Sequence, residues 1–467
     1  MEPARQHHNV TLAVLTLAGT AFAFQQTMVF PALPTFQEEF GASTAWSTWV
    51  LTAFLVSAAV STPILAKLGD QYGKEHVLLV SLGLFLLGCV GAAAAWDLWS
   101  LIGFRALSGA GGAVFPLSFS IIRDEFPRER VGVGIGLLSA VFGVGGGFGI
   151  VLSGVIVDHL SWRLLFVLGS IPVAASLALV YRFVPESPIR TPSRVDVPGA
   201  LLLSGALVTF MVALTEGEHL GWLSAPILGL VAASAVIFLV WVRVESRSQA
   251  PMVDMRMLAH RPVLLTNVTT MISGFALFTC FVLVPAFVES PAERGYGFGA
   301  SATQAGLYLL PSSIAMLFSG PVAGLVGRRF GPKWPLAAGM AIVSLAALLL
   351  SLAHSEPWQV VLASGLLGLG VGAAFAAMVS LIAENVDARE MGIATGMNTV
   401  VRMVGAVVGG QVGAALLTAQ TIGSTRVPAE SAFTWAFGLG AVAALTAAAV
   451  ALSITRRPLR RLVPAAG

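Results

Sequence analysis

Long apolar stretches recur along almost the whole chain, and they limit its possible folds more than any other feature. Fourteen of them, separated by charged or Pro- and Gly-rich breaks, lie at about residues 10–33, 46–66, 77–95, 98–121, 132–157, 164–184, 198–215, 224–242, 263–288, 301–327, 335–353, 358–383, 391–419 and 432–455. A bilayer core ~30 Å thick needs ~20 apolar helical residues to cross it. Only 10% of the residues are charged, against about 25% in a soluble domain. We therefore expect an all-α integral membrane protein with 14 transmembrane helices.

Lysine and arginine residues are distributed unevenly between the two sides that these spans define. If both termini lie inside, 21 of them fall in inner segments, while those elsewhere are Arg163, Arg294 and Arg426 in outer segments and Arg105 and Arg402 within spans. Cytoplasmic loops carry this kind of basic excess. We predict that both termini are cytoplasmic, including a basic tail at 456–467. The net charge of +3 then reflects loop bias and not nucleic-acid binding.

The chain offers little for enzyme chemistry or metal binding. Cys89 and Cys280 both lie inside apolar runs, so neither a disulfide framework nor a metal cluster is indicated. The nearest grouping of polar catalytic residue types, Glu216, Glu218 and His219, has a spacing that suits no metal site. A membrane-embedded enzyme remains a distant alternative. We expect no enzymatic activity, no cofactor and no metal.

Two segments of the chain occur twice, the longer of them at an offset of 260 residues. The stretch 107–137, "LSGAGGAVFPLSFSIIRDEFPRERVGVGIGL", matches 367–397, "LGLGVGAAFAAMVSLIAENVDAREMGIATGM", with a charged loop in both copies. A second pair, "AKLGDQYGK" at 66–74 and "GLVGRRFGPK" from 324, aligns Gly73 with Gly331. Both copies fall on the predicted cytoplasmic side. Parallel repeats of this kind occur in transporters whose binding site lies between the halves.

The repeat defines the expected domains. They are an N-terminal six-helix bundle (1–190), two extra linker helices with a cytoplasmic loop (191–262), a C-terminal six-helix bundle (263–455) and the basic cytoplasmic tail (456–467).

Several motifs carry a resemblance to one transporter family. They are the turn at 66–74, "LIGFRALSGAGG" at 101–112, "GGGFGIVLSG" at 145–154, "DHLSWR" at 158–163, "PALP" at 31–34, "VDVPGALLL" at 195–203 and "GMNTVVRMVG" at 396–405. With these motifs the chain resembles the major facilitator superfamily, and specifically its fourteen-span drug:proton antiporter branch. The resemblance covers nearly the whole chain.

The resemblance implies roles for particular residues. Asp70, Gly73 and Lys74, with Arg328 and Gly331 in the second copy, match the family's conformational gate. Gly73 would let the chain turn sharply, and Asp70 would face either the N-terminus of a neighbouring helix or an arginine such as Arg123 or Arg130. The family assigns coupling roles to the arginines at the positions of Arg105 and Arg402, and its antiporter-motif helix corresponds to Gly145, Gly149 and Gly154.

Two positions depart from the family pattern. Gln25 stands where an aspartate is usual in the first span, and Ile150 stands where the fifth-span motif usually has proline. Glutamine cannot titrate and arginine effectively never loses its proton. Proton exchange would therefore use acids at span ends (Asp70, Asp158, Glu216 and Glu384). The alternative is facilitated exchange or diffusion of a metabolite without proton coupling.

The expected cargo is a small, moderately apolar molecule, such as an antibiotic, a drug or a secreted metabolite. Aromatic, Met and amide side chains suit such a ligand at mid-membrane, and the candidate lining residues are Phe24, Gln25, Gln26, Met28, Phe30, Ser118, Asn267, Tyr308 and Asn398. Arg105 and Arg402 would favour an anionic or carbonyl-rich cargo. Partners would be this small molecule, protons and the lipid bilayer. The resemblance implies a multidrug efflux permease, which we expect to be a monomer. Richness in Ala, Gly and Arg with few Lys is typical of a high-GC bacterium, so we expect a bacterial cytoplasmic membrane.

Overall fold

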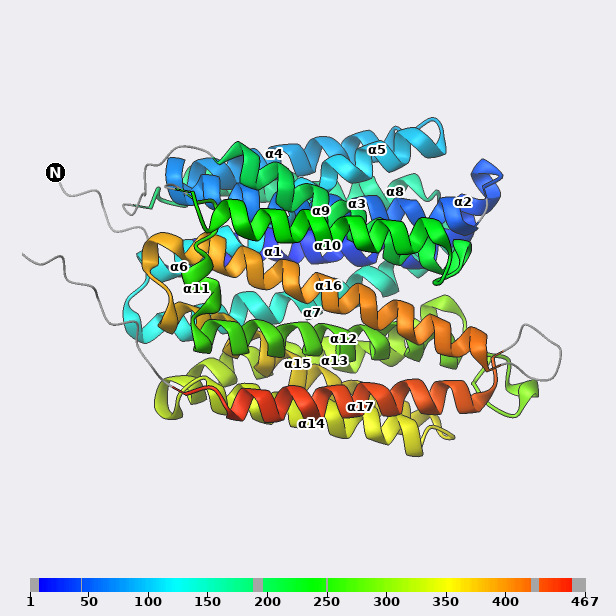
Figure 1. The fold of residues 1–467 in the computed structure, drawn as a ribbon. Coiled ribbons are helices and arrows are strands. Elements are labelled where there is room, and N and C mark those ends of the chain that lie inside the picture. The colour runs from blue at the N-terminus through cyan, green and yellow to red at the C-terminus, as the bar shows by residue number, and fades with distance from the viewer. Residues whose placement is uncertain (1–7, 43, 188–195, 249–250, 421–427, 456–467) are drawn as a thin grey trace, which may run out of the picture.

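The computed structural model describes residues 8–42, 44–187, 196–248, 251–420 and 428–455. Within these residues all the secondary-structure elements are α-helices or short 3₁₀ helices. Fourteen helices are long and apolar enough to cross a membrane. They run side by side along one axis (Figure 1). The predicted all-α fold with 14 spans is therefore confirmed. The predicted basic tail 456–467 lies outside the described residues.

The spanning helices follow the order of the predicted apolar runs. They are α1 (His8–Thr27), α3 (Thr44–Tyr72), α4 (Lys74–Ala93), α5 continued by α6 (Leu98–Ser108 and Val114–Glu125), α7 (Arg128–His159), α8 (Arg163–Phe183), α9 (Val197–Leu220), α10 (Ala225–Glu245), α12 (Arg261–Glu289), α13 (Ala302–Phe330), α14 (Lys333–Leu352), α15 (Pro357–Asn385), α16 (Met391–Ala419) and α17 (Glu430–Leu452). Short helices α2 (Leu33–Phe40) and α11 (Met255–Ala259) and the 3₁₀ turns η1 (Phe30–Ala32), η2 (Gly109–Ala113), η3 (Ala292–Arg294) and η4 (Ala388–Glu390) complete the chain.

The first span ends earlier than the sequence predicts. The apolar run continues to residue 33, but α1 stops at Thr27 and the chain passes through η1 into α2. Pro31 explains the difference, because it has no N–H to donate to the carbonyl of Thr27 four residues earlier and its ring clashes with that carbonyl. Pro34 lies in the first turn of α2, where proline is tolerated. The fourth span is also not uniform: η2 joins α5 to α6, and Gly109 and Gly112 within it lie directly against the backbone of α3.

The duplication is visible in helix lengths and in one backbone geometry. Helices α3 and α13 each have 29 residues, and the following helices α4 and α14 each have 20. Gly73 joins the first pair with φ 122° and ψ 133°, and Gly331 joins the second with φ 97° and ψ 145°. These positive φ values favour glycine. The two copies of the motif therefore make the same turn.

The extra helices α9 and α10 form a hairpin beside the place where α3 meets α16. Helix α9 packs against both of them, and the indole Nε1 of Trp49 on α3 donates a hydrogen bond to Glu216 Oε1 on α9 at 2.8 Å. Helix α10 packs mainly on α9 and leaves most of its apolar surface exposed, as a lipid-facing helix does. The domain boundaries at residues 190 and 262 stay a prediction.

Candidate gate and binding residues

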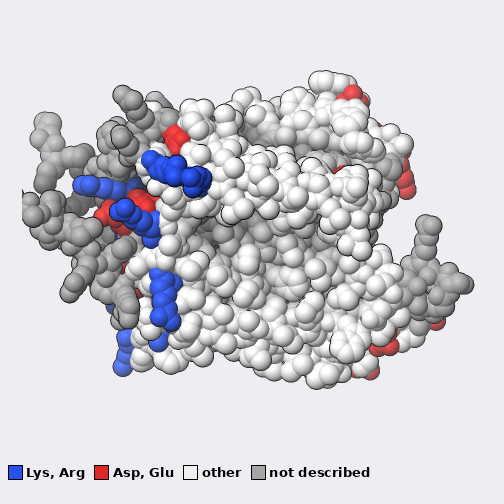
Figure 2. Space-filling view, in the orientation of Figure 1, with Lys and Arg blue, Asp and Glu red and all other residues white. Residues whose placement is uncertain are grey.

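Four interhelical turns gather at one end of the molecule. They are those between α3 and α4, α6 and α7, α13 and α14, and α15 and α16. Three contacts join them: the ion pair of Lys74 with Asp124, a hydrogen bond from Arg328 to the Glu129 carbonyl at 2.7 Å, and one from Arg123 to the Val386 carbonyl at 2.7 Å. The lysines and arginines visible in Figure 2 lie at one end of this face. Both copies of the repeated turn thus lie at the same end.

Asp70, Lys74, Asp124 and the backbone N–H of Ile393 form what we call the gate cluster. Asp70 Oδ2 accepts a hydrogen bond from the Ile393 N–H at 3.1 Å, in the first turn of α16. Lys74 Nζ lies 3.8 Å from Asp70 Oδ1 and pairs with Asp124, and the Asp70 and Lys74 side chains are 2% and 0% exposed. A carboxylate is stabilised at a helix N-terminus. The cluster therefore joins the two repeats with a buried, charge-assisted contact.

The gate geometry selects one of the two partners expected for Asp70. The contact is with a helix N-terminus, and the nearby arginines bond elsewhere. Arg123 donates to the backbone carbonyls of Val386 and Asp387. Arg130 lies at hydrogen-bond distance from Asn9 on α1, at 3.5 Å.

Neither Asp124 of the gate cluster nor its neighbour Ser187 is predicted as a site residue from the sequence. Asp124 binds both Lys74 and the hydroxyl of Ser187, whose Oγ donates at 2.5 Å. Ser187 is 63 residues away in the chain, in the segment that follows α8. The one available signal is a charged pair, Arg123 and Asp124, at the end of a span. That signal gives no partner.

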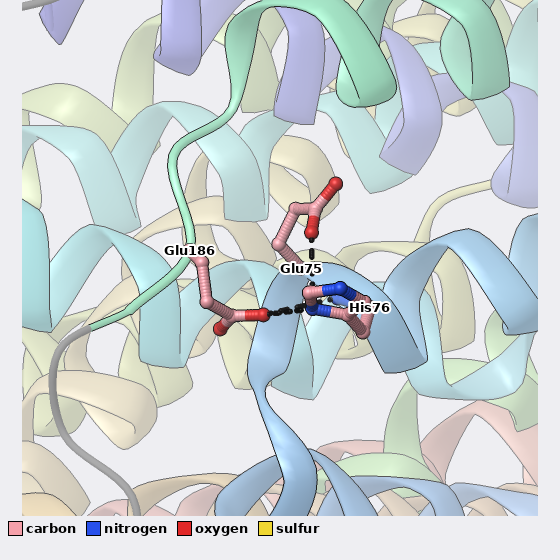
Figure 3. A group of neighbouring side chains, drawn as sticks. All are labelled: Glu75, His76 and Glu186. Carbon is pink, nitrogen blue, oxygen red and sulfur yellow. Dashed lines mark hydrogen bonds and ion pairs between the residues drawn. The ribbon is translucent and has the colours of Figure 1, made fainter.

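A second polar cluster consists of Glu75, His76 and Glu186 (Figure 3), and Glu75 directly follows Lys74 of the gate cluster in the chain. His76 Nδ1 lies 2.5 Å from Glu186 Oε2 and 3.3 Å from Glu75 Oε2. A Cβ at Gly73 would overlap the Glu186 carboxylate. Both carboxylates already bind His76, and we interpret the three side chains as a hydrogen-bonded strap that holds the chain after α8 against the repeated turn.

The strap has an expected pH dependence. Burial by itself raises the pKa of Glu186, but hydrogen bonds from the side chain and N–H of His76 and from the N–H groups of Glu75 and Ser187 outweigh it, so the pKa lies below its usual value. A depressed carboxyl pKa contributes stability that is present above the unfolded pKa of about 4.3 and is lost as pH falls through the folded pKa.

We therefore expect Glu186→Gln to lower the Tm of the purified protein at pH 7, with the difference from the unaltered chain shrinking as pH falls below about 4. Thermal unfolding followed between pH 3 and 8 measures this. Glu293→Gln, at an exposed position, is the control. A difference that stays constant down to pH 3 would mean that the Glu186 charge is not involved.

Glycines let α7 lie against α13 along most of its length. A Cβ at Gly132 would meet the Gly324 carbonyl oxygen at 3.2 Å, and one at Gly136 would overlap the Gly320 carbonyl oxygen. Towards the other end a Cβ at Gly154 would meet Thr303 at 3.1 Å. The two repeats meet along this line as well as at the gate cluster.

The antiporter-motif residues divide between two neighbours. Gly145 and Gly149 lie against the backbone of α1, at Thr20 and Phe24, whereas Gly154 faces α13. Ile150, in the place of the family's usual proline, packs on the apolar core of α12–α17. This helix therefore contacts its own repeat and the other one at alternating positions.

The two arginines within spans have different surroundings. Arg105 is fully buried among α3, α5 and α8, and its Nε donates to the Val50 carbonyl at 3.2 Å. Arg402 on α16 lies over the ring of Phe375, with Cζ 4.4 Å from the ring centroid. The structure does not bring the two arginines together.

The predicted cavity residues fall into separate groups. Asn398 Nδ2 donates to Asn267 Oδ1 at 2.9 Å and to Thr270 Oγ1 at 2.8 Å, which ties α16 to α12. Met28 is fully buried in an apolar cluster with residues of α7 and α8. Tyr308 stacks on Phe298 with ring centroids 5.6 Å apart.

The remaining predicted lining residues belong to the N-terminal repeat. Phe24 is half-buried beside Gly149. The side chains of Gln25, Gln26 and Ser118 are buried, and each carries a polar atom without a hydrogen-bond partner. Phe30 begins η1, and its side chain lies outside the described part of the structure.

The spanning helices form two repeats, which meet along α7 and α13 and at the charged gate cluster. This arrangement defines a polytopic membrane protein of the duplicated type that secondary transporters use. The chain matches the family model described as Major Facilitator Superfamily over residues 15–297 and 268–467. The chain belongs to the major facilitator superfamily, as the sequence motifs predicted.

Curated relatives include proteins named for export and resistance. An uncharacterized MFS-type transporter of Mycobacterium tuberculosis is 32% identical over 446 residues, covering 92% of this chain and 63% of the relative. This chain thus spans less than two thirds of that relative's length. The tetracenomycin C resistance and export protein of Streptomyces glaucescens is 28% identical, with 87% and 74% covered. Multidrug resistance protein 3 of Bacillus subtilis is 29% identical, with 83% and 75% covered. These names support the drug-efflux branch.

Solved structures share the fold. The human organic anion transporter MFSD10 gives a TM-score of 0.69 at 16% identity, covering 96% of this chain and 100% of the other. The proton:xylose symporter XylE gives 0.64 at 14% identity, with 94% of each chain covered. At these identities the likeness shows the fold alone.

Proposed function

We propose that this protein exports a small, moderately apolar organic molecule across a bacterial cytoplasmic membrane by alternating access, in exchange for protons. The observation that carries the proposal is the gate cluster. It is a buried, charge-assisted contact between two repeats at one end of the bundle, and such a contact can hold one state of a rocking pair. Relatives named for multidrug resistance and for tetracenomycin C export support export as the direction.

Each group of site residues has a part in this proposal. The gate residues Asp70, Gly73, Lys74, Arg328 and Gly331 would close the cytoplasmic end. Both termini would lie in the cytoplasm, since the basic turns gather there. Arg105 and Arg402 would serve coupling, and α7, with Gly145, Gly149 and Gly154, would transmit motion between the repeats because it contacts both.

Facilitated exchange without protons is the second candidate, and one observation favours it. Gln25 cannot carry a proton, and the acidic side chains in the described spans lie near helix ends, such as Asp70, Asp158 and Glu384. Coupling in the first candidate would pass through these end groups. The two candidates differ in their response to a pH gradient.

We expect transport in proteoliposomes to depend on an imposed pH gradient. The full chain is reconstituted, and uptake of fluorescent lipophilic drugs and of aromatic antibiotics, including tetracenomycin C, is followed with and without the gradient. A protonophore should reduce the rate at least tenfold. Protein-free liposomes give the leak rate. A gradient-independent rate above this leak would support facilitated exchange, and a rate equal to the leak for the whole panel would contradict both candidates.

A further inference from the structure

The guanidinium of Arg105 is buried in the N-terminal repeat with its two terminal nitrogens unpartnered. The side chain is 0% exposed. Nε donates to the Val50 carbonyl, whereas Nη1 and Nη2 have no hydrogen-bond partner. The Phe54 ring covers one face of the guanidinium, with Cζ 4.2 Å from the centroid. One face of the guanidinium and its Nε atom are thus in contact with protein groups, whereas Nη1 and Nη2 have no hydrogen-bond partner.

Gln25 carries a second orphaned polar group close to the first. Its side chain on α1 is 0% exposed, and neither Oε1 nor Nε2 has a hydrogen-bond partner. A Cβ at Gly169 of α8 would overlap the Gln25 amide. Phe166, one turn earlier on the same face of α8, lies 6.0 Å from Arg105 Cζ. Gln25 and Arg105 therefore contact one face of α8 about a turn apart.

Among the described residues no carboxylate forms an ion pair with Arg105, so its buried positive charge has no counter-ion in this part of the chain. A charge buried in a spanning segment is costly unless it is paired. A bound anion would remove this cost.

The shape of the bare group indicates which anion fits. Two parallel N–H groups of a guanidinium bind a carboxylate in a bidentate manner, and the Gln25 amide can donate one more hydrogen bond. The rings of Phe54 and Phe166 beside the guanidinium suit the apolar body that carries such a group. An inorganic monoanion would satisfy the same nitrogens.

We propose that Arg105 and Gln25 form a binding subsite for a single anionic group, a carboxylate of the cargo or an inorganic anion of similar size. Its assignment to cargo rests on the proposed export function, whereas anion binding itself does not. The exported molecules would then include organic acids with an aromatic or apolar body.

The test measures anion-dependent thermal stability of the purified full chain in detergent. Sodium benzoate, its neutral isostere benzamide, and sodium chloride are titrated separately, and the same titrations of Arg105→Gln give the non-specific effect of each salt on Tm. We expect a saturable rise in Tm of about 2 °C or more with benzoate or chloride and none with benzamide, because a ligand that binds the folded state alone stabilises it. A benzoate response assigns the site to organic carboxylates, and a response to chloride alone assigns it to an inorganic anion.

Three variants make the test specific. Gln25→Glu places a carboxylate beside Arg105, so it should abolish the anion response and raise the ligand-free Tm. Arg105→Gln should also abolish the response. Arg182→Gln, which removes an exposed cation at the other end of α8, should retain it.

The absence of any saturable shift in the unaltered chain, or a shift that persists in Gln25→Glu, would overturn the proposal. Because binding is measured without transport, the two proposals can fail separately. Transport without an anion response contradicts only the subsite. An anion response in a protein that moves no substrate contradicts only the exporter.

Discussion

Asp70→Asn is expected to reduce transport tenfold or more while leaving the amount of protein in the membrane unchanged. The substitution keeps the shape of the side chain but removes its charge from the first turn of α16 and from beside Lys74. Hydrogen bonds to charged groups contribute about 1.5–3 kcal/mol. A loss of this size shifts the balance between open and closed gate about tenfold or more, so the closed state would no longer be held.

Two measurements separate this effect from misfolding. Efflux rate is normalised to membrane protein content. In addition, Ala66→Cys places a thiol at a fully buried position beside Gly396, and its reaction with a maleimide should be faster in the Asp70→Asn background. Glu38→Gln removes an exposed acid at the far end of the bundle and should change neither rate. Normal transport by Asp70→Asn would show that the gate cluster does not control the cycle.

The sequence predicts what depends on local pattern and on duplication. Apolar length sets the fourteen spans, and the glycine in each repeated turn sets the same backbone geometry at Gly73 and Gly331. For Asp70 the motif resemblance left two partners open, a helix N-terminus and an arginine, and only the structure selects the first. The spans and the turns rest on residues close in sequence or on a copied segment.

Side-chain partners across long separations could not be predicted in the same way. Asp124 meets Ser187 and Lys74 because α4, α6 and the chain after α8 converge, and apolar periodicity carries no information about such rotations. Membrane helices are apolar on most faces, so the sequence did not distinguish lining from packing. Asn398 and Gln25 are both buried amides, yet Asn398 donates to Asn267 and Thr270 whereas the Gln25 amide has no hydrogen-bond partner.

The strap and the gate cluster together attach the chain after α8 to the repeated turn of the N-terminal repeat. Ser187 binds Asp124, and the adjacent Glu186 binds His76, so the chain leaving α8 is fastened to the same turn that carries Lys74. The linker hairpin α9–α10 starts shortly beyond. Movement of the gate cluster would therefore displace the segment that connects the repeats. The hairpin would move with the N-terminal repeat, because Trp49 on α3 is hydrogen-bonded to Glu216 on α9.

Gly136→Ala is expected to reduce transport by at least tenfold, because one methyl group would separate the two repeats. A Cβ at this position overlaps the Gly320 carbonyl oxygen, which belongs to the backbone of α13 and cannot rotate away. Overpacking of this kind costs about 1–3 kcal/mol, and here it acts on the surface along which α7 and α13 meet. Relief requires that the helices move apart, which changes their relative position in the state that the structure shows.

Gly146→Ala is the matched control on the same helix. Its Cβ would meet only the Thr27 methyl group at 3.5 Å, an ordinary van der Waals contact, so transport should stay within about twofold. Both variants are compared by proteoliposome uptake and by Tm. If Gly136→Ala transports normally, α7 and α13 do not need their close approach. If both variants lose activity equally, glycine content in α7 matters for helix flexibility and not for contact between the repeats.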